Sequence, residues 1–282
     1  MRRTLVVLAS LLGLAGCSAT SSDTTTTPVT EPSAPGSTPS SGLIDIGDRS
    51  LYLECEGSGD PTVMLEAGLA GDHRTWEDVM PRISPSSRVC SYNRANILPS
   101  ESAPTPRTAD DMVADLRALL MAAHEDPPYV LVGSSFGGLV TQLYASSHSA
   151  EIAGMVLVDS NHPDEVEKFA TELTAAQIEE DHEFVNSNEE GVDVFASFKE
   201  VQGAPPLPDL PLVVVTAGIS EGWPPGWDAK VFDRLRAEQQ ADLARLVPDG
   251  TQLIARKSAH DVPLQQPDVV VKAIESVLAQ AR

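Results

Sequence analysis

The sequence predicts an α/β domain built on a mostly parallel sheet. Short runs rich in β-branched residues recur along the chain, and segments with apolar residues at helical spacing separate them. Several runs, such as 129–132 and 155–158, are apolar without interruption, as expected of strands whose two faces are both covered by helices. Regular alternation of strands and helices indicates parallel strands joined by helical crossovers.

Charge and composition exclude several classes of protein. The 282 residues carry 19 Lys plus Arg against 41 Asp plus Glu, a net charge of −22, and only 5% are aromatic. We therefore expect no nucleic acid partner, because nucleic acid binding needs a basic surface and often aromatic stacking. The 41% hydrophobic residues suffice for a substantial core. Three cysteines cannot form a four-cysteine zinc site, and we expect no metal.

The first residues have the pattern of an export signal. Two arginines precede an apolar run over 5–15, which is too short to span a bilayer as a helix of about 20 residues. The run ends at LAGC, residues 14–17, which resembles a bacterial lipobox. This resemblance implies a lipoprotein signal peptide over 1–16 and a lipid on Cys17, which would anchor the protein outside the cytoplasm at the bacterial cell membrane. An ordinary signal peptide with an incidental cysteine is the alternative.

Residues 17–42 are predicted to form a disordered tether. They are almost all Ser, Thr, Pro, Ala and Gly, without apolar periodicity. Such a composition buries too little surface to offset its chain entropy. We expect one folded domain over 43–282.

The folded part is predicted to begin with a hairpin, with strands over 43–46 and 50–55 around the turn at Gly47 and Asp48. Further β-branched runs predict strands over 62–66, 88–92, 129–132, 154–158, 212–216 and 252–255. Apolar residues at a helical period predict helices over 108–124, 230–247 and 268–281, the first with Thr108 as its N-cap.

Residues 160–210 interrupt this alternation and are predicted to form an inserted cap over the sheet. They contain helical stretches over 163–173 and 175–184 and end in a proline-rich segment. Acidic residues outnumber lysines by 13 to two, which predicts that the cap disfavours anionic substrates. Alternatively, these acids form only a solvated outer face.

The sequence GSSFG, residues 133–137, lies between a predicted strand and a helical segment. A G-x-S-x-G pattern in this context is typical of a nucleophile elbow, a turn too tight for side chains beside the serine. Ser135 would then stand above the sheet, and a second glycine at 138 strengthens the interpretation. The alternative is a glycine-rich turn with an idle serine.

A serine hydroxyl needs a base before it can act as a nucleophile. His260 lies after the last predicted strand and before the last helix, which gives the chain order serine, acid, histidine expected of this elbow. His73 and His162 are candidates for a substrate contact. We expect the remaining histidines on the surface: His124, His148 and His182.

As a whole, the chain from about 43 to 282 resembles the α/β-hydrolase family. The resemblance rests on VMLEAGL at 63–69, RVCSYNRA at 88–95, the elbow, VLVD at 156–159 and SAH at 258–260. It implies a serine hydrolase that cleaves a small-molecule carboxylic ester or related acyl compound, with no cofactor. It also implies that the backbone amides of Leu69 and Phe136 form the oxyanion hole.

The chain departs from the family pattern at three positions. Ser134 stands where the family often has His, and Asn93 and Asn96 stand where Asp and Gly are common. Asparagine tolerates the left-handed backbone, so the loop can keep its shape, although Asn93 has no functional explanation from the sequence.

Two carboxylates are candidates for the third member of the triad. Asp159 ends the strand beside the elbow strand, and some family members take their acid from this position. Glu221 follows Gly218 by three residues, where the family more often has Asp, but it lies in a Gly- and Pro-rich loop on a longer side chain. We favour Asp159, because orienting an imidazole requires rigidity.

The family's sheet also places the strand containing Cys55 beside the strand containing Cys90. Together with export to an oxidising compartment, this implies a Cys55–Cys90 disulfide, with two buried free thiols as the alternative.

Two other functions stay open: a catalytically silent binding lipoprotein of this fold, and acyl transfer or a cofactor-free haloperoxidase-like activity.

Overall fold

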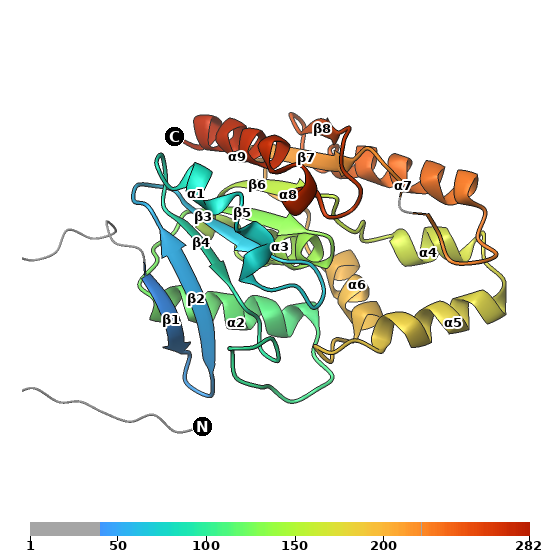
Figure 1. Cartoon of the computed structure of the whole chain (residues 1–282), viewed down its shortest axis with the longest axis horizontal. Helices are drawn as coiled ribbons and strands as arrows, with labels where there is room; N and C mark the ends of the chain where they lie inside the picture. The colour runs from blue at the N-terminus through green and yellow to red at the C-terminus, as the bar shows by residue number, and fades with distance from the viewer. Residues whose placement is uncertain (1–39, 221) are drawn as a thin grey trace, which may run out of the picture. The chain divides into compact units, whose positions relative to one another are not determined.

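The computed structural model describes residues 40–220 and 222–282, and their strands form one sheet in the order β1-β2-β4-β3-β5-β6-β7-β8 (Figure 1). Strand β2 is antiparallel to both of its neighbours, and every other neighbouring pair is parallel. The strands are β1 (Ser40–Asp45), β2 (Ser50–Glu56), β3 (Thr62–Glu66), β4 (Val89–Tyr92), β5 (Tyr129–Ser134), β6 (Ile152–Val158), β7 (Leu212–Ala217) and β8 (Thr251–Ala255).

Helices cover both faces of this sheet. The α-helices are α1 (Met80–Ile83), α2 (Ala109–Ala122), α3 (Phe136–Ser147), α4 (Glu165–Ala170), α5 (Ala175–Asn186), α6 (Val194–Gly203), α7 (Ala229–Leu243), α8 (Val262–Gln265) and α9 (Pro267–Ala281). Two short 3₁₀ helices, η1 (His73–Trp76) and η2 (Ser149–Glu151), complete the described elements.

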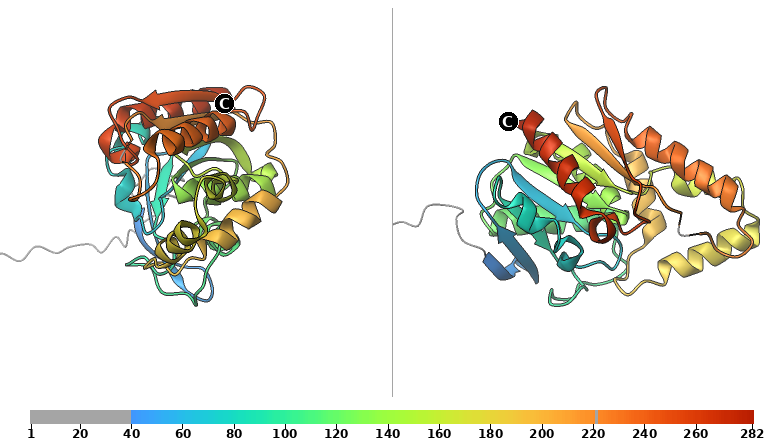
Figure 2. Two further views of the ribbon diagram at one scale, coloured as in Figure 1. Left: turned by 90° about the vertical axis from the view of Figure 1, so that its right-hand side faces the viewer. Right: turned by 45° about the horizontal axis from the view of Figure 1, so that its top comes forward.

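Alternate residues of the central strands pack against different helices. Leu131 of β5 lies in one apolar cluster with residues of α2 and α3, whereas Val130 and Val132 lie in another with α1 and α9. Figure 2 shows α9 running along one face of the sheet. Because both faces are buried, the central strands are apolar throughout, which is the pattern that the sequence carries.

The predicted strands and helices agree closely with the observed ones. Strand β3 has the predicted bounds, and α2 begins directly after its predicted N-cap, where the Asp111 carboxylate accepts from the Thr108 N–H at 3.0 Å. Several boundaries were wrong: β1 begins at Ser40, not at 43, β6 begins at Ile152, not at 154, and α7 ends at Leu243, not at 247. The pairing of β1 with β2 extends as far as Ser40 opposite Cys55. Residues 40–42, which were predicted to belong to the tether, are therefore part of a strand because they pair with β2.

The insertion 160–210 contains α4, α5 and a third helix, α6, which the sequence did not predict. Phe198 and Val194 of α6 belong to the apolar cluster formed with α2 and α3, so this end of the insertion is part of the main core. Helices α4 and α5 lie on the side of the sheet away from β1 and β2 (Figure 1). The insertion is therefore a cap whose base is fused to the domain.

The predicted disulfide is confirmed. Cys55 on β2 lies directly opposite Cys90 on β4, both side chains are fully buried, and their sulfur atoms are bonded. Within the described residues, the only group of three or more potential metal ligands is this pair with Glu125, and a disulfide offers no thiolate.

The predicted signal peptide over 1–16, the lipidation site Cys17 and the tether as far as residue 39 lie outside the described residues. In the part of the chain that the structure describes, no helix combines the length and hydropathy that a membrane crossing requires.

Candidate active site

Ser135 occupies a sharp turn between β5 and α3. Its backbone has φ 52° and ψ −124°, a conformation that is unusual for any residue other than glycine. The turn is held on both sides, because the Ser135 N–H donates to Val158 O at 3.0 Å and the Ser135 carbonyl accepts from Gly138 N–H at 2.9 Å. The surrounding hydrogen bonds therefore maintain the strained backbone of the elbow.

The glycines of the elbow are required by neighbouring segments. A Cβ atom on Gly137 would lie 2.3 Å from the carbonyl oxygen of Ala67, and one on Gly138 would lie 1.9 Å from Ser160 Oγ. The same addition at Gly133 would meet Gly137 O at 2.5 Å. The turn is thus pressed between the loop after β3 and the end of β6.

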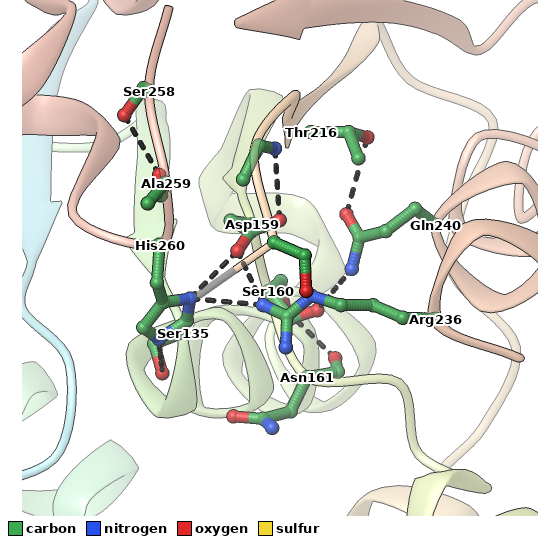
Figure 3. Close-up of polar contacts among 12 residues, drawn as sticks. Ser135, Asp159, Ser160, Asn161, Thr216, Arg236, Gln240, Ser258, Ala259 and His260 are labelled. Atoms are coloured by element: carbon green, nitrogen blue, oxygen red, sulfur yellow. Dashed lines mark hydrogen bonds and ion pairs between the residues drawn. The ribbon is translucent and has the colours of Figure 1, made fainter. Parts of the chain in front are cut away.

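His260 lies in the loop between β8 and α8, and its imidazole reaches Ser135 and Asp159. The distance from His260 Nε2 to Ser135 Oγ is 2.9 Å, and that from His260 Nδ1 to Asp159 Oδ2 is 2.7 Å (Figure 3). The loop is fixed by Gln265, whose side-chain oxygen accepts from the Ala259 N–H at 2.8 Å. Three residues that are distant in sequence thereby form one hydrogen-bonded chain.

Asp159 follows β6 in a left-handed conformation, with φ 42°, and its side chain is fully buried. Its Oδ1 atom accepts from the Ala217 N–H at 3.0 Å. Burial alone would raise the pKa of Asp159, but the hydrogen bond with His260 and the charge of Arg236 outweigh it, and the pKa lies below its usual value. The alternative acid, Glu221, lies outside the described residues.

Arg236 of α7 is a site residue that the sequence analysis missed. Its Nη2 atom contacts Asp159 Oδ2 and lies 2.9 Å from His260 Nδ1 (Figure 3). One turn further along the helix, Gln240 donates to the Ser160 carbonyl at 2.6 Å. No sequence signal distinguishes Arg236, because a lone arginine on an amphipathic helix is usually a solvated surface residue.

Leu69 and Phe136, the predicted oxyanion residues, both line the cavity that contains Ser135. Phe136 is the first residue of α3, where a backbone N–H has no acceptor within the helix. The loop containing Leu69 approaches closely, since a Cβ atom on Gly68 would lie 3.3 Å from Ser135 Cβ. The structure therefore brings both residues beside the serine.

A buried ion cluster lies under the loop that follows β3. The Arg94 guanidinium contacts the carboxylates of Glu66 and Glu190, and the Tyr92 hydroxyl donates to Glu66. Burial would lower the pKa of Arg94, but Glu190 and Glu66 raise it well above its usual value. Burial raises the pKa of Glu66, and the charge of Arg94 opposes that change.

The cavity beside Ser135 and His260 has a volume of about 470 Å³ and a mainly apolar lining from the cap and the loop after β7. Its apolar side chains include Phe169, Leu173, Ile178, Val194, Phe198 and Trp227. Two carboxylates, Glu165 and Asp181, also line it, and burial raises the pKa of each. A ligand here would meet hydrocarbon surface with few polar groups, as in most small-molecule sites.

Three of the other histidines are placed differently from expectation. His73 and His162 do not line this cavity, whereas His182, which was expected only on the surface, is exposed and lines the cavity, with its ring centroid 3.7 Å from that of Phe195. The contact of His73 gives a structural role to Asn93, which had no explanation from the sequence: Asn93 Oδ1 accepts from the His73 N–H at 2.8 Å.

The loop after β4 keeps its shape as expected. Asn96 adopts φ 72°, the left-handed conformation that asparagine tolerates. Asn93 also supports this loop, because its Nδ2 donates to the Leu98 carbonyl at 2.6 Å.

Comparisons with known proteins agree with the fold described above. Residues 61–195 match the family model described as the alpha/beta hydrolase fold. The chain is 29% identical over 241 residues to the uncharacterized protein YqjL of Bacillus subtilis (strain 168). This alignment covers 80% of this chain and 87% of that protein.

Solved structures show the same fold. A thermophilic esterase from Thermogutta terrifontis has a TM-score of 0.62 and 20% identity, over 86% of this chain and 99% of that one. An enol-lactonase from Burkholderia xenovorans LB400 has a TM-score of 0.62 and 16% identity, over 84% of this chain and 100% of that one. The chain therefore has the fold of the α/β-hydrolase family.

Proposed function

We propose that the protein is a serine hydrolase that cleaves a carboxylic ester or a related acyl compound. The observation that supports this most is the continuous contact from Ser135 Oγ to His260 Nε2, at 2.9 Å, and from His260 Nδ1 to Asp159 Oδ2, at 2.7 Å. A strained serine, a base and a buried acid in this order are the parts that nucleophilic acyl transfer requires.

In the proposed reaction, Ser135 Oγ attacks the carbonyl carbon while His260 Nε2 takes its proton. The tetrahedral oxyanion accepts hydrogen bonds from the backbone amides of Leu69 and Phe136, a contribution of about 3 kcal/mol for each donor in comparable sites. The imidazolium then protonates the departing alcohol, which leaves an acyl-serine. Water, deprotonated by His260, releases the acid and restores the serine.

Asp159 is the proposed acid of this triad. Its low pKa keeps the carboxylate ionised where the imidazole must act, so that it can hold one tautomer and stabilise the imidazolium. Its burial and the Ala217 hydrogen bond supply the rigidity that favoured it over Glu221.

The proposed substrate is an uncharged ester with an apolar acyl or alcohol group. The apolar lining of the 470 Å³ cavity supports a hydrocarbon moiety. Its lining carries two carboxylates, Glu165 and Asp181, against one guanidinium, that of Arg236, a balance that disfavours an anionic moiety. The esterase and the enol-lactonase of the same fold are consistent with an acyl substrate.

A fluorophosphonate probe tests this proposal, because it labels only an activated serine. We expect labelling of the wild type that disappears in Ser135→Ala, and hydrolysis of p-nitrophenyl esters that increases from acetate towards longer uncharged chains. A monoester of a dicarboxylic acid, which is anionic, should react more slowly at low salt than an uncharged ester of similar length. An unlabelled wild type would instead support a catalytically silent binding protein.

We also propose that the protein is an exported lipoprotein, anchored through Cys17. The lipobox-like LAGC sequence and the Ser/Thr/Pro-rich segment after it support this. Detergent phase partitioning tests it: the full chain should enter the detergent phase, and Cys17→Ala should remain in the aqueous phase. Equal partitioning of both would contradict lipid attachment.

A further inference from the structure

Arg94 lies between the loop that follows β3 and a residue of the cap. Its guanidinium contacts Glu190, which lies in the turn between α5 and α6, and Glu66 at the end of β3. The three side chains are nearly inaccessible, with exposed fractions of 4% for Arg94, 0% for Glu190 and 1% for Glu66. Solvent therefore does not weaken these contacts.

The same guanidinium binds the backbone of the proposed oxyanion loop. Arg94 Nη1 donates to the Ala67 carbonyl at 2.8 Å, and Nη2 donates to the Gly68 carbonyl at 2.6 Å. The Gly68 carbonyl and the Leu69 N–H belong to one peptide group, which is planar and trans. Because the carbonyl and the N–H point in opposite directions, holding the carbonyl fixes the direction of the Leu69 N–H.

Glu190 fixes the next peptide group along the loop. Its Oε2 atom accepts from the Ala70 N–H at 3.0 Å and from Arg94 Nη2 at 2.9 Å. The peptides on both sides of the Leu69 Cα atom are thus held by one ion pair. Rotation of the Leu69 N–H away from the serine would break the charge-assisted bonds to Arg94 or Glu190.

Glu190 is itself held in place by the chain between β4 and α2. Its backbone carbonyl accepts from Asn96 Nδ2 at 2.9 Å, and the Gly191 carbonyl accepts from the Arg107 N–H at 2.9 Å. Gly191 has φ 73°, and a Cβ atom there would lie 2.2 Å from Thr105 Cγ2. The carboxylate consequently reaches Arg94 from a fixed point of the cap.

We propose that Arg94, held by Glu190 of the cap, is a positioning residue that sets the Leu69 N–H in its oxyanion-binding orientation. This inference rests on the proposed function. Buried ion pairs add little to stability compared with apolar residues of similar volume, which favours a role in positioning over one in stability alone. The cap insertion would then supply part of the catalytic geometry as well as the walls of the cavity.

The test compares Arg94→Lys and Glu190→Gln with a matched control. Lysine keeps the charge, but its three N–H donors share one nitrogen and cannot reproduce the guanidinium fork, which binds two carbonyls and two carboxylates. The glutamine oxygen can still accept from the Ala70 N–H but loses the ion pair. The control is Glu125→Gln, which breaks the partly buried Arg88–Glu125 ion pair at the opposite, amino-terminal edge of the parallel strands.

The measured quantities are kcat and KM for a p-nitrophenyl ester, and the affinity for a trifluoromethyl ketone, which forms a tetrahedral oxyanion adduct with the serine. We expect Arg94→Lys to lower kcat by about 10²- to 10³-fold, the range for loss of one oxyanion donor, with little change in KM. Affinity for the ketone should fall by a similar factor. Glu190→Gln should show a smaller loss of the same kind, and Glu125→Gln should show none.

Folded variants with wild-type kcat and ketone affinity would overturn the inference, as would equal losses in Glu125→Gln. If Arg94→Lys does not fold, Glu190→Gln still decides between the outcomes, since its volume and its acceptor for Ala70 are kept. Failure of the proposed function is distinguishable, because the wild type itself would then neither hydrolyse the ester nor react with a fluorophosphonate.

Discussion

Asp159 Oδ2 lies 2.7 Å from His260 Nδ1, although the two residues are 101 positions apart in the sequence. The other carboxylate oxygen accepts from the Ala217 N–H, and Arg236 contacts Oδ2 from α7. The carboxylate is thus fixed on both of its oxygen atoms. An imidazole that donates to this carboxylate presents Nε2 to Ser135 in the form that can accept a proton.

The first prediction concerns this acid. Asp159→Asn should lower kcat by about 10⁴-fold, the loss seen when a triad acid is replaced by its amide and the tautomer is no longer fixed. Glu221→Gln should change kcat by no more than a few-fold. Steady-state kinetics of the two variants with one ester decides between them, and a collapse in Glu221→Gln alone would reverse the assignment.

The second prediction concerns the packing of the elbow. Gly138→Ala should lower the free energy of unfolding by about 1–3 kcal/mol, because its Cβ atom would overlap Ser160, with 1.9 Å to Oγ and 2.4 Å to Cβ. Gly203→Ala, at the end of α6, is the matched control, since nothing lies within 4 Å of its added Cβ atom. Urea unfolding measures the stability of both variants. Equal stability would contradict the prediction, because it would mean that the elbow accommodates the added Cβ atom of Gly138→Ala without a clash.

The third prediction concerns pH and Glu165, which lines the cavity and whose Oε1 accepts from Asn161 Nδ2 at 2.9 Å. Burial raises its pKa in the folded protein, so the folded chain binds this proton more tightly than the unfolded chain. Stability is therefore lost as the pH rises from the unfolded value of about 4.3 through the folded pKa. Glu165→Gln should be more stable than the wild type at pH 7, and this advantage should vanish below about pH 4.

Chemical denaturation at both pH values measures this difference. Glu172→Gln serves as the control, because Glu172 is exposed just beyond α4. A Glu165→Gln advantage that is equal at both pH values would mean that titration of this carboxyl is not its source.

The fourth prediction concerns the disulfide. Cys55 and Cys90 are separated by 35 positions, and closing a loop of this size stabilises a folded protein by about 2–4 kcal/mol. The double variant Cys55→Ala, Cys90→Ala should lose this amount in urea unfolding. Its kcat, measured where it is folded, should match the wild type, since the pair lies on β2 and β4 and does not line the cavity. The intact mass of the unfolded wild type should increase by two hydrogen atoms on reduction.

Much of the fold was predictable because its signals are local. Strand β3 has the predicted bounds because an uninterrupted apolar run marks a strand buried on both faces. The elbow was recognisable because a turn of this shape tolerates only glycine at several positions, as the contacts of Gly133 and Gly137 show. Helix α6 was missed because its apolar residues lie in an acidic segment that resembles a solvated face.

By itself, the sequence determined the order of strands and helices, the position of Ser135 in a glycine-rich turn and the place of His260 after the last strand. Backbone preferences and apolar periods suffice for these features, because they depend on neighbouring residues. Only the tertiary structure decided that Arg236 contacts Asp159 and that Glu190 reaches Arg94, 96 positions away. A charged residue on a solvated surface and one in a buried ion pair cannot be told apart in the sequence. The difference is whether water reaches the charge, and that depends on the packing of segments that are distant in the sequence.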